Sequence, residues 1–312
     1  MVIRITRMVL LVQLLIAAAL YLLARRALGI GSPALAGLLA VGTVLLVRML
    51  ITANNFGLAW LYRSETPHHH RVTRHAALRL FFSEYVASMV TSSWTMGFCT
   101  FREWHGDAGL PPVLLVHGYG CNSGYWHFMS RALRRAGISH YAIDLEPVFA
   151  GIDQFVPQLH ARIEAICRQS GHDRLIIVAH SMGGLVARAY LRDHGAARIV
   201  RVITLGTPHR GTGLARFGAG DNSRQMQWTG SAIEGRCSAW LAELERREDP
   251  AHRALFVSIY SHQDNIVSPQ LSSCLPGALN VEFNGIGHVA LGLHPRVQQE
   301  VIKAIKAAAH HA

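Results

Sequence analysis

The sequence predicts an α/β fold with a mostly parallel sheet and helices on both faces, preceded by an N-terminal two-helix membrane hairpin. From Pro111 onward, short apolar runs alternate with stretches of helical spacing, which is typical of a parallel sheet wrapped by helices. Before Pro111, two long segments are almost free of charge. The chain of 312 residues is long enough for one large domain and a smaller part.

The two N-terminal segments are apolar enough to cross a membrane. The first covers about residues 8–24 and the second about residues 28–51, with Arg25 and Arg26 between them. A bilayer core of about 30 Å needs roughly 20 apolar helical residues, which is near both lengths. A cleaved secretory signal is the alternative for the first segment, but its length and the second apolar run favour a retained anchor. We therefore expect two transmembrane helices within residues 1–52.

Residues 53–110 connect the hairpin to the larger domain. Within them, residues 76–90 predict an apolar, amphipathic helix, which either lies in the membrane interface or packs against the larger domain. His68, His69 and His70 are adjacent, and neighbouring side chains point in different directions, which favours a polar loop over a metal site. We expect no metal site in the chain. The five cysteines form no CxxC pair and indicate neither a disulfide framework nor a zinc site.

The larger domain, residues 111–312, alternates predicted strands and helices. An insertion at about residues 211–250 interrupts the alternation, and it is too long for a plain loop, so we expect a lid or cap there. The predicted strands are 113–116, 139–143, 175–179, 199–205, 255–260 and 279–283, and the predicted helices are 124–136, 153–169, 182–194 and 295–308.

The stretch V-A-H-S-M-G-G at residues 178–184 lies between a predicted strand and a predicted helix. On a sharp strand-to-helix turn, the side chains two residues before and two after the central serine crowd together, and here both are small. A match of this kind occurs by chance in many proteins, but the strand before it and the helix after it indicate a reactive serine. The expected nucleophile elbow comprises Ala179, His180, Gly183 and Gly184 around Ser181.

Asp264 and His288 follow Ser181 in the chain order that a serine nucleophile needs, each after a predicted strand. A serine hydroxyl is a weak nucleophile and requires a base. Histidine, with an ordinary pKa of about 6.5, can take and return the proton, and an aspartate fixes its tautomer. Asp144, which also ends a strand, and His294, at a helix boundary, are the rivals, and we favour Asp264 and His288.

Charge that develops on a substrate oxygen also needs hydrogen-bond donors. The motif H-G-Y-G at residues 117–120 follows the first strand of the domain. The backbone N–H of Tyr119 and that of Met182, the residue after the serine, are therefore the expected oxyanion hole.

Three motifs together resemble the bacterial lipases of the α/β-hydrolase superfamily: V-H-G-Y-G, A-H-S-M-G-G, and T-L-G-T-P-H-R-G-T at residues 204–212. The sequence is most similar to the small lipases whose elbow begins with alanine, over roughly residues 111–308. The resemblance implies an α/β-hydrolase fold, a triad of Ser181, Asp264 and His288, and ester hydrolysis through an acyl-enzyme without a cofactor. Some family members bind calcium, but no carboxylate cluster here can be assigned to it.

The expected function is a membrane-anchored serine ester hydrolase, a lipase or esterase acting on acyl esters of lipids. A carboxylesterase, a thioesterase and an acyltransferase share the same triad and remain alternatives. A catalytically silent membrane scaffold is disfavoured, because all three triad residues and both oxyanion positions are present. The expected partners are a lipid or acyl ester substrate and the membrane, and the sequence leaves the oligomeric state open.

The expected location is the bacterial inner membrane, with a multi-pass anchor. Two spans leave both ends of the hairpin on one side, and arginines lie beyond both ends, at Arg4 and Arg7 and at Arg63, Arg71 and Arg74. The positive-inside rule then favours the cytoplasm for both ends and for the catalytic domain. The net charge of +11 suits an anionic lipid surface. Nucleic-acid binding is not expected, because no basic cluster interleaved with aromatic residues lies beside a recognisable nucleic-acid module.

Overall fold

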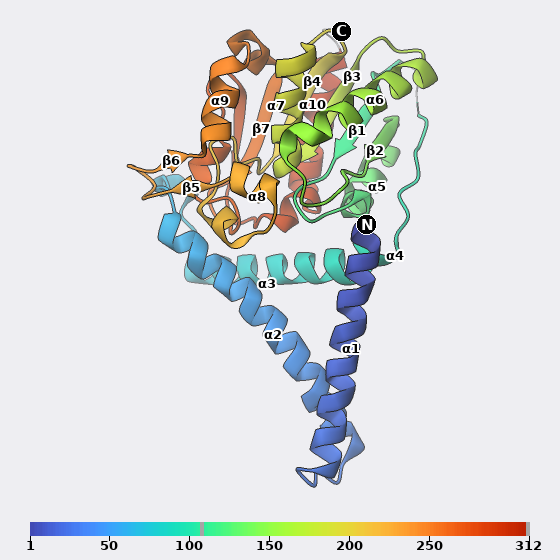
Figure 1. The fold of residues 1–312 in the computed structure, drawn as a ribbon, viewed down its shortest axis with the longest axis vertical. Helices are drawn as coiled ribbons and strands as arrows, with labels where there is room; N and C mark the ends of the chain where they lie inside the picture. The colour runs from blue at the N-terminus through green and yellow to red at the C-terminus, as the bar shows by residue number, and fades with distance from the viewer. Residues whose placement is uncertain (107–108, 310–312) are drawn as a thin grey trace.

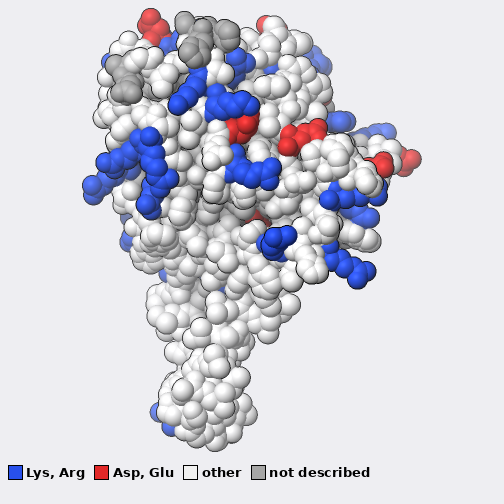
Figure 2. Space-filling view, turned by 180° about the vertical axis from the view of Figure 1, so that it is seen from behind, with Lys and Arg blue, Asp and Glu red and all other residues white. Residues whose placement is uncertain are grey.

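The computed structural model describes residues 1–106 and 109–309. Two long helices, α1 (Val2–Arg26) and α2 (Pro33–Tyr62), project from the rest of the molecule and meet at the tip of the projection (Figure 1). Both are long and apolar enough to cross a membrane, and few of their apolar residues are buried within the chain. On the face seen in Figure 2, the projection is almost free of charged side chains except for a basic group at its tip.

Helix α2 is one continuous element. It begins where the Ser32 side chain accepts a hydrogen bond from the N–H of Leu35 at 3.3 Å, with Pro33 in its first turn. It then runs through residue 52, where the sequence predicts that the membrane segment ends, and continues to Tyr62. Its last turns therefore reach the larger domain (Figure 1).

Helix α3 (Arg74–Val90) lies across the base of the larger domain, between that domain and the projecting helices (Figure 1). It buries Leu80, Glu84 and Ala87 and leaves another set of side chains exposed, at the spacing of a second helix face. That exposed set is apolar and consists of Leu78, Phe82 and Val86. The helix therefore packs against the larger domain on one side while presenting an apolar face on the other. The short helical segments that flank it are η1 (His68–His70), the π-helical turn η2 (Thr91–Thr95) and α4 (Met96–Phe98).

A six-stranded sheet with the order β2-β1-β3-β4-β7-β8 forms the centre of the larger domain, and every pairing in it is parallel. Strands β1, β3 and β7 are buried throughout, as expected for strands covered on both faces. The predicted parallel sheet is confirmed. Its strands are β1 (Val113–Val116), β2 (His140–Ile143), β3 (Leu175–His180), β4 (Ile199–Leu205), β7 (Phe256–Ser261) and β8 (Leu279–Phe283).

Helices cover both faces of this sheet, as the sequence predicts. Leu114 and Val116 of β1 pack into a core with α6 (Ile152–Ser170) and α7 (Met182–His194). Val113 and Leu115 of the same strand pack into a second core with α5 (His127–Arg135) and α10 (Pro295–Ala309). The alternation along β1 follows from the two-residue repeat of a strand.

The segment between β4 and β7 is a folded insertion. After the turn that follows β4, it contains three helical segments, a two-stranded antiparallel hairpin and a final turn before β7. The elements are η4 (Gly213–Phe217), α8 (Asp221–Gln225), β5 (Trp228–Thr229), β6 (Arg236–Cys237), α9 (Ala239–Arg247) and η5 (Pro250–Leu255).

Three loops at the carboxyl edge of the sheet also contain short helical turns. The helix predicted over residues 124–136 is a 3₁₀ turn, η3 (Ser123–Trp126), followed by α5. The reason is local, because the Asn122 side chain accepts a hydrogen bond from the N–H of Gly124 at 2.9 Å and starts the chain in a tight turn. The other two turns are η6 (Gln270–Ser273) and η7 (Val289–Gly292). Polar residues at this edge are brought together because parallel strands all end there.

Candidate functional site

Ser181 occupies a strained turn between β3 and α7. Its backbone angles are φ 54° and ψ −126°, and it is the one non-glycine residue with positive φ in the described parts of the chain. Such a conformation costs of order 1–3 kcal/mol and persists only where the surroundings enforce it. Here the Ser181 N–H donates to the carbonyl of Leu205 at 2.9 Å, and its carbonyl accepts from the Thr207 hydroxyl at 2.8 Å. The end of β4 therefore holds the serine in place.

Glycines surround Ser181 because backbone approaches closely there. A Cβ atom on Gly183 would lie 2.6 Å from the carbonyl oxygen of Val116, and one on Gly184 would lie 2.2 Å from the hydroxyl of Thr207. A Cβ on Gly118 would lie 2.8 Å from the Cβ of Ser181 itself. Any side chain at these positions would push the turn, the start of α7 and the loop after β1 apart. The buried Ala179, at the end of β3, pairs with Val116.

Asp264 and His288 lie together, both buried, at the ends of β7 and β8. The Nδ1–H of His288 donates to Oδ2 of Asp264 at 2.7 Å. The other oxygen of Asp264 accepts from the N–H groups of Ile266 and Val267 at 2.8 and 2.7 Å. This network fixes the carboxylate and leaves Nε2 of His288 as the free, basic nitrogen.

Two carboxylates act on the charge of His288. Burial disfavours the imidazolium, but Asp264 and, more weakly, Glu84 favour it, and the pKa of His288 lies above its ordinary value. A base with a raised pKa accepts a proton more readily, and an adjacent carboxylate stabilises the imidazolium that results. The pair can therefore take a proton from a neighbouring hydroxyl.

Glu84 of α3 supports the loop that carries His288. Its carboxylate is 1% exposed and accepts from the N–H groups of Val289 and Ala290 at 2.9 and 3.0 Å, at the start of η7. Burial raises the pKa of Glu84, and the two N–H donors oppose that shift. The sequence analysis did not single out this residue, although it is the one acidic residue in the apolar segment 76–90.

His180, which the sequence predicts as part of the elbow, is a second support for the His288 loop, and this role was not predicted. Its ring stacks on Tyr125 at 4.4 Å, and its Nε2–H donates to the carbonyl of His288 at 3.1 Å. Burial and the neighbouring His288 hold the pKa of His180 well below its usual range, so it acts as a neutral donor. The Tyr125 hydroxyl in turn donates to the carbonyl of Val289 at 3.1 Å and accepts from the N–H of Gly292 at 3.0 Å.

The loop after β1 lies against Ser181. Nδ1–H of His117 donates to the carbonyl of Gly118 at 2.9 Å, and its Nε2 accepts from the N–H of Leu145 at 3.0 Å. These bonds hold the loop with Gly118 against Ser181 and with Tyr119 at the same cavity as Ser181. Met182 is the first residue of α7, so its N–H has no acceptor within the helix.

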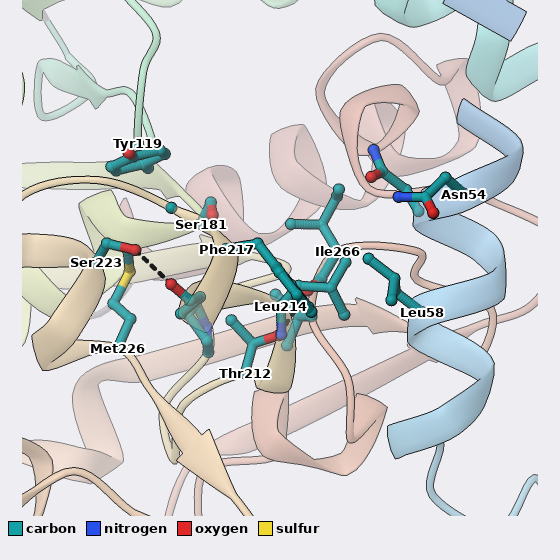
Figure 3. Close-up of a pocket in the computed structure, with 15 residues that line it drawn as sticks. Asn54, Leu58, Tyr119, Ser181, Thr212, Leu214, Phe217, Ser223, Met226 and Ile266 are labelled. Carbon is teal, nitrogen blue, oxygen red and sulfur yellow. Dashed lines mark hydrogen bonds between the residues drawn. The ribbon is translucent and has the colours of Figure 1, made fainter. Parts of the chain in front are cut away.

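The Ser181 side chain makes no hydrogen bond within the described residues. It faces a cavity of about 440 Å³, to which Tyr119 also contributes (Figure 3). Hydrogen bonds of a catalytic serine are often long in the absence of substrate. The hydroxyl is therefore positioned to meet a ligand that enters the cavity.

Residues 111–229 match the sequence model of the α/β hydrolase fold. The larger domain has the fold that this model describes, and the matched residues make up its first part. Two relatives named triacylglycerol lipase, from Pseudarthrobacter phenanthrenivorans and Burkholderia plantarii, are each 30% identical over 114 residues. That stretch is 34% of this chain and 35% and 32% of the relatives, so the chain spans about a third of the length of the relatives it matches.

Solved structures have the same α/β hydrolase fold. The mature Bacillus licheniformis lipase BlEst2 is similar with a TM-score of 0.53 and 20% identity, over 65% of this chain and 96% of that one. Aspergillus fumigatus lipase B is similar with a TM-score of 0.55 and 16% identity, over 66% of this chain and 55% of that one. The fold predicted from the three sequence motifs is thereby confirmed.

Within this α/β hydrolase domain, the two rival residues lie in other surroundings. Asp144 accepts from the N–H of Ser123 at 2.6 Å and lies 3.8 Å from Nε2 of His117. His294 lies at the start of α10, where its Nδ1 accepts from the N–H of Arg296 at 3.3 Å. The structure therefore pairs His288 with Asp264 and gives Asp144 a role in the loop after β1.

The cavity of the α/β hydrolase domain has a wall that comes from outside the domain. Leu214, Phe217 and Met226 of the insertion line it, as do Ile266 and Val267 after β7. Asn54, Asn55 and Leu58 of α2 complete it, and Figure 3 shows Asn54 and Leu58 projecting from α2 toward the other lining residues. No local pattern in the sequence indicates this wall, because the contact joins segments far apart in the chain.

Proposed function

We propose that this protein is a membrane-anchored serine ester hydrolase, a lipase or esterase that cleaves acyl esters of lipids through an acyl-enzyme. The observation that carries the proposal is the strained Ser181 turn, which opens on an apolar cavity next to the hydrogen-bonded pair of Asp264 and His288. The relatives named triacylglycerol lipase support the same reaction. No step requires a cofactor or a metal ion.

In the first half of the proposed reaction, Nε2 of His288 takes the proton of the Ser181 hydroxyl while the oxygen attacks the acyl carbonyl carbon. The carbonyl oxygen becomes negatively charged and accepts hydrogen bonds from the N–H groups of Tyr119 and Met182. The ester C–O bond then breaks. The imidazolium returns its proton to the departing alcohol, which leaves the acyl group on Ser181.

In the second half, water takes the place of the alcohol. His288 accepts a proton from the water, whose oxygen attacks the acyl carbon, and the same two N–H groups hold the oxyanion. Collapse releases the carboxylic acid and returns the proton to the Ser181 oxygen. Asp264 stays ionised throughout and stabilises the imidazolium in both halves.

The surroundings of the cavity favour a lipid ester over a small soluble ester. Its wall is mostly apolar, and Leu58 of α2 extends it toward the projecting helices. Helix α3, whose exposed side chains include Leu78, Phe82 and Val86, lies between the larger domain and those helices (Figure 1). An apolar surface of this kind suits the boundary between lipid headgroups and acyl chains. A substrate embedded in a membrane would then lie next to the cavity.

We further propose that α1 and α2 are retained membrane spans, so that the protein is a multi-pass protein of the bacterial inner membrane with its catalytic domain in the cytoplasm. On this proposal, residues 1–52 are the anchor, residues 53–110 connect it to the domain, and residues 111–312 are catalytic. Protease treatment of intact spheroplasts tests the sidedness, with protection of the domain expected. Digestion of the domain in intact spheroplasts would place it outside the cytoplasm.

Residues 211–250 are the proposed lid. The Tyr119 hydroxyl donates to the carbonyl of Ala219 at 2.8 Å and accepts from its N–H at 2.9 Å. These bonds tie the insertion to the loop that supplies one of the proposed oxyanion donors. Substrate entry that displaces the insertion would therefore break them.

A fluorophosphonate probe tests the reaction class directly. It should form a covalent adduct on Ser181 under native conditions, and Ser181→Ala should abolish both labelling and turnover. Ser170→Ala is the control, because Ser170 ends α6 at the opposite edge of the sheet from the site. An unlabelled Ser181, or full labelling of Ser181→Ala, would overturn the proposal.

The dependence of hydrolysis on acyl chain length tests the substrate class. Activity should increase toward long, membrane-embedded acyl esters. Activity confined to short soluble esters would indicate a carboxylesterase, preference for thioesters a thioesterase, and transfer to an added alcohol in place of water an acyltransferase.

A further inference from the structure

Three imidazoles and one carboxylate meet at the edge of the sheet, apart from the Ser181 cavity. His69 and His70 come from η1, His262 directly follows β7, and Glu282 lies in β8, the edge strand. One ligand atom each from His69, His70 and Glu282 lies within 4.8 Å of the others. Nε2 of His70 and Nε2 of His262 both lie 2.9 Å from the same oxygen, Oε2 of Glu282.

Two separations among these atoms, from Glu282 to His70 and from Glu282 to His262, are close to those around a tetrahedral zinc ion. With Zn–N and Zn–O bonds of about 2.0–2.1 Å, neighbouring ligand atoms lie roughly 3.3 Å apart. The two separations of 2.9 Å from Glu282 are slightly shorter than that, so a small outward movement makes room for an ion. Neutral imidazole and carboxylate are donors that Zn²⁺ takes readily in proteins.

The groups around the cluster fix its orientation. The Tyr260 hydroxyl donates to Oε1 of Glu282 at 3.0 Å, which leaves Oε2 directed at the imidazoles. The Gln263 side chain donates to the carbonyl of His70 at 3.0 Å and accepts from the N–H of Gly285 at 2.7 Å. Partners that hold ligands in this way are typical of metal sites. Both η1 and the end of β8 are thus tied to the segment after β7.

Packing between the imidazoles also helps to fix their orientation. The rings of His70 and His262 stack with centroids 4.4 Å apart, and His262 is 4% exposed.

We propose that His69, His70, His262 and Glu282 form a zinc site. The expectation that His68, His69 and His70 form only a polar loop rests on their adjacency, since three neighbouring side chains diverge. The structure supplies the missing partners from β7 and β8. With four protein ligands the site is closed, so the zinc is structural and joins the segment between α2 and α3 to the edge of the sheet.

Zinc binding by the full chain, purified in detergent without a polyhistidine tag and stripped with a chelator, tests the proposal. Calorimetric titration with Zn²⁺ should give one ion per chain, and zinc should raise the unfolding temperature. Glu282→Gln and His70→Asn should each weaken binding by more than tenfold and remove the thermal shift. Tyr260→Phe should weaken binding by about 10- to 100-fold while keeping the ligands.

His68→Asn is the matched control, because His68 lies in the same helical turn with its side chain exposed. It should bind zinc like the unchanged chain. Absence of stoichiometric binding by the unchanged chain would overturn the proposal, as would equal binding by Glu282→Gln, which would indicate an adventitious ion only. The experiment measures metal binding, so its result does not depend on whether the protein hydrolyses esters.

Discussion

The hydrolase domain and the N-terminal helices place the same kind of residue in opposite surroundings. Ile177 and Val178 of β3 are fully buried by the rest of the domain, whereas Leu14 of α1 and Leu38 of α2 are 65% and 70% exposed. Burial of apolar surface of this extent stabilises the folded domain. The apolar surface of the helices is not covered by the chain, and exposed surface of this extent marks a site for a membrane or a partner.

The two regions meet at the last turns of α2 and at α3. There, residues of the N-terminal region are packed against the larger domain. The Ser268 hydroxyl donates to the carbonyl of Ala59 at 2.7 Å, which fixes α2 to the loop after β7. Leu58 lines the cavity, and Glu84 supports the loop of His288. The N-terminal region therefore contributes to the candidate site and is also the proposed anchor. Four predictions test how much each region contributes to the site.

The largest effect should arise wholly within the hydrolase domain. Asp264→Asn should lower kcat by about 10⁴-fold, because the amide favours the wrong tautomer of His288. Steady-state kinetics measure the loss, with circular dichroism as a check on folding. Asp144→Asn is the control, since it keeps an acceptor for the Ser123 N–H and should change kcat little. Equal losses in both variants would mean that the acid is misassigned.

The next effect tests whether α3 contributes to the site. Glu84→Gln leaves one acceptor oxygen for two N–H groups, so it should lower the free energy of unfolding by about 1–3 kcal/mol. Displacement of the His288 loop should lower kcat/KM by about 10- to 100-fold. Glu65→Gln, at an exposed position in the same connecting region, should change neither quantity. Reduced stability with full activity would limit Glu84 to a structural role.

A smaller effect tests the α2 wall. Leu58→Trp should fill part of the cavity and lower kcat/KM about tenfold more for long than for short acyl esters. Leu61→Trp is the matched control, because Leu61 lies on the same helix, is 65% exposed and does not line the cavity. Identical profiles for the two variants would argue that α2 does not contact the substrate.

The smallest effect is a shift along the pH axis. The pKa of His288 is raised, so His288 loses its neutral, basic form as the pH falls through that raised value. The acidic limb of the kcat/KM profile should therefore lie above the ordinary histidine pKa of about 6.5. Asp264 is the main cause of the rise and Glu84 a lesser one. Glu84→Gln should therefore move the limb to lower pH. An unchanged limb would mean that Glu84 is neutral in this range or that its charge is screened from His288.

The parts of the molecule that the sequence predicts well are those with short-range signals. The apolar runs at 113–116 and 199–205 are strands with the same bounds in the structure, because both faces of each are buried. Ser181, Asp264 and His288 each follow a strand, and the parallel sheet brings its strand ends to one edge. The chain order alone therefore indicated residues that the fold places at that edge.

The parts that the sequence misses depend on contacts between distant segments. Glu84 bonds to the chain 205 and 206 residues away, and Tyr62 of α2 packs on Gly213. The adjacency of His68, His69 and His70 favoured a polar loop, because neighbouring side chains diverge. The proximity of Glu282 to His69 and His70 depends on the fold and could not be predicted from the sequence. The sequence also could not choose between an interfacial and a packed α3, because one face of the helix packs against the larger domain and the other is apolar and exposed.

The continuity of α2 has a mechanical consequence. Its 30 residues span about 45 Å as one rod, which starts at the tip of the projection and lines the cavity with Asn54, Asn55 and Leu58 near its other end. If α2 spans a bilayer as we propose, a thicker or thinner membrane changes its tilt. Because α2 is one rigid helix, Leu58 then moves when the helix tilts. Bilayer thickness would in this way set the width of the cavity, and the lipid surroundings would tune the enzyme that acts on them.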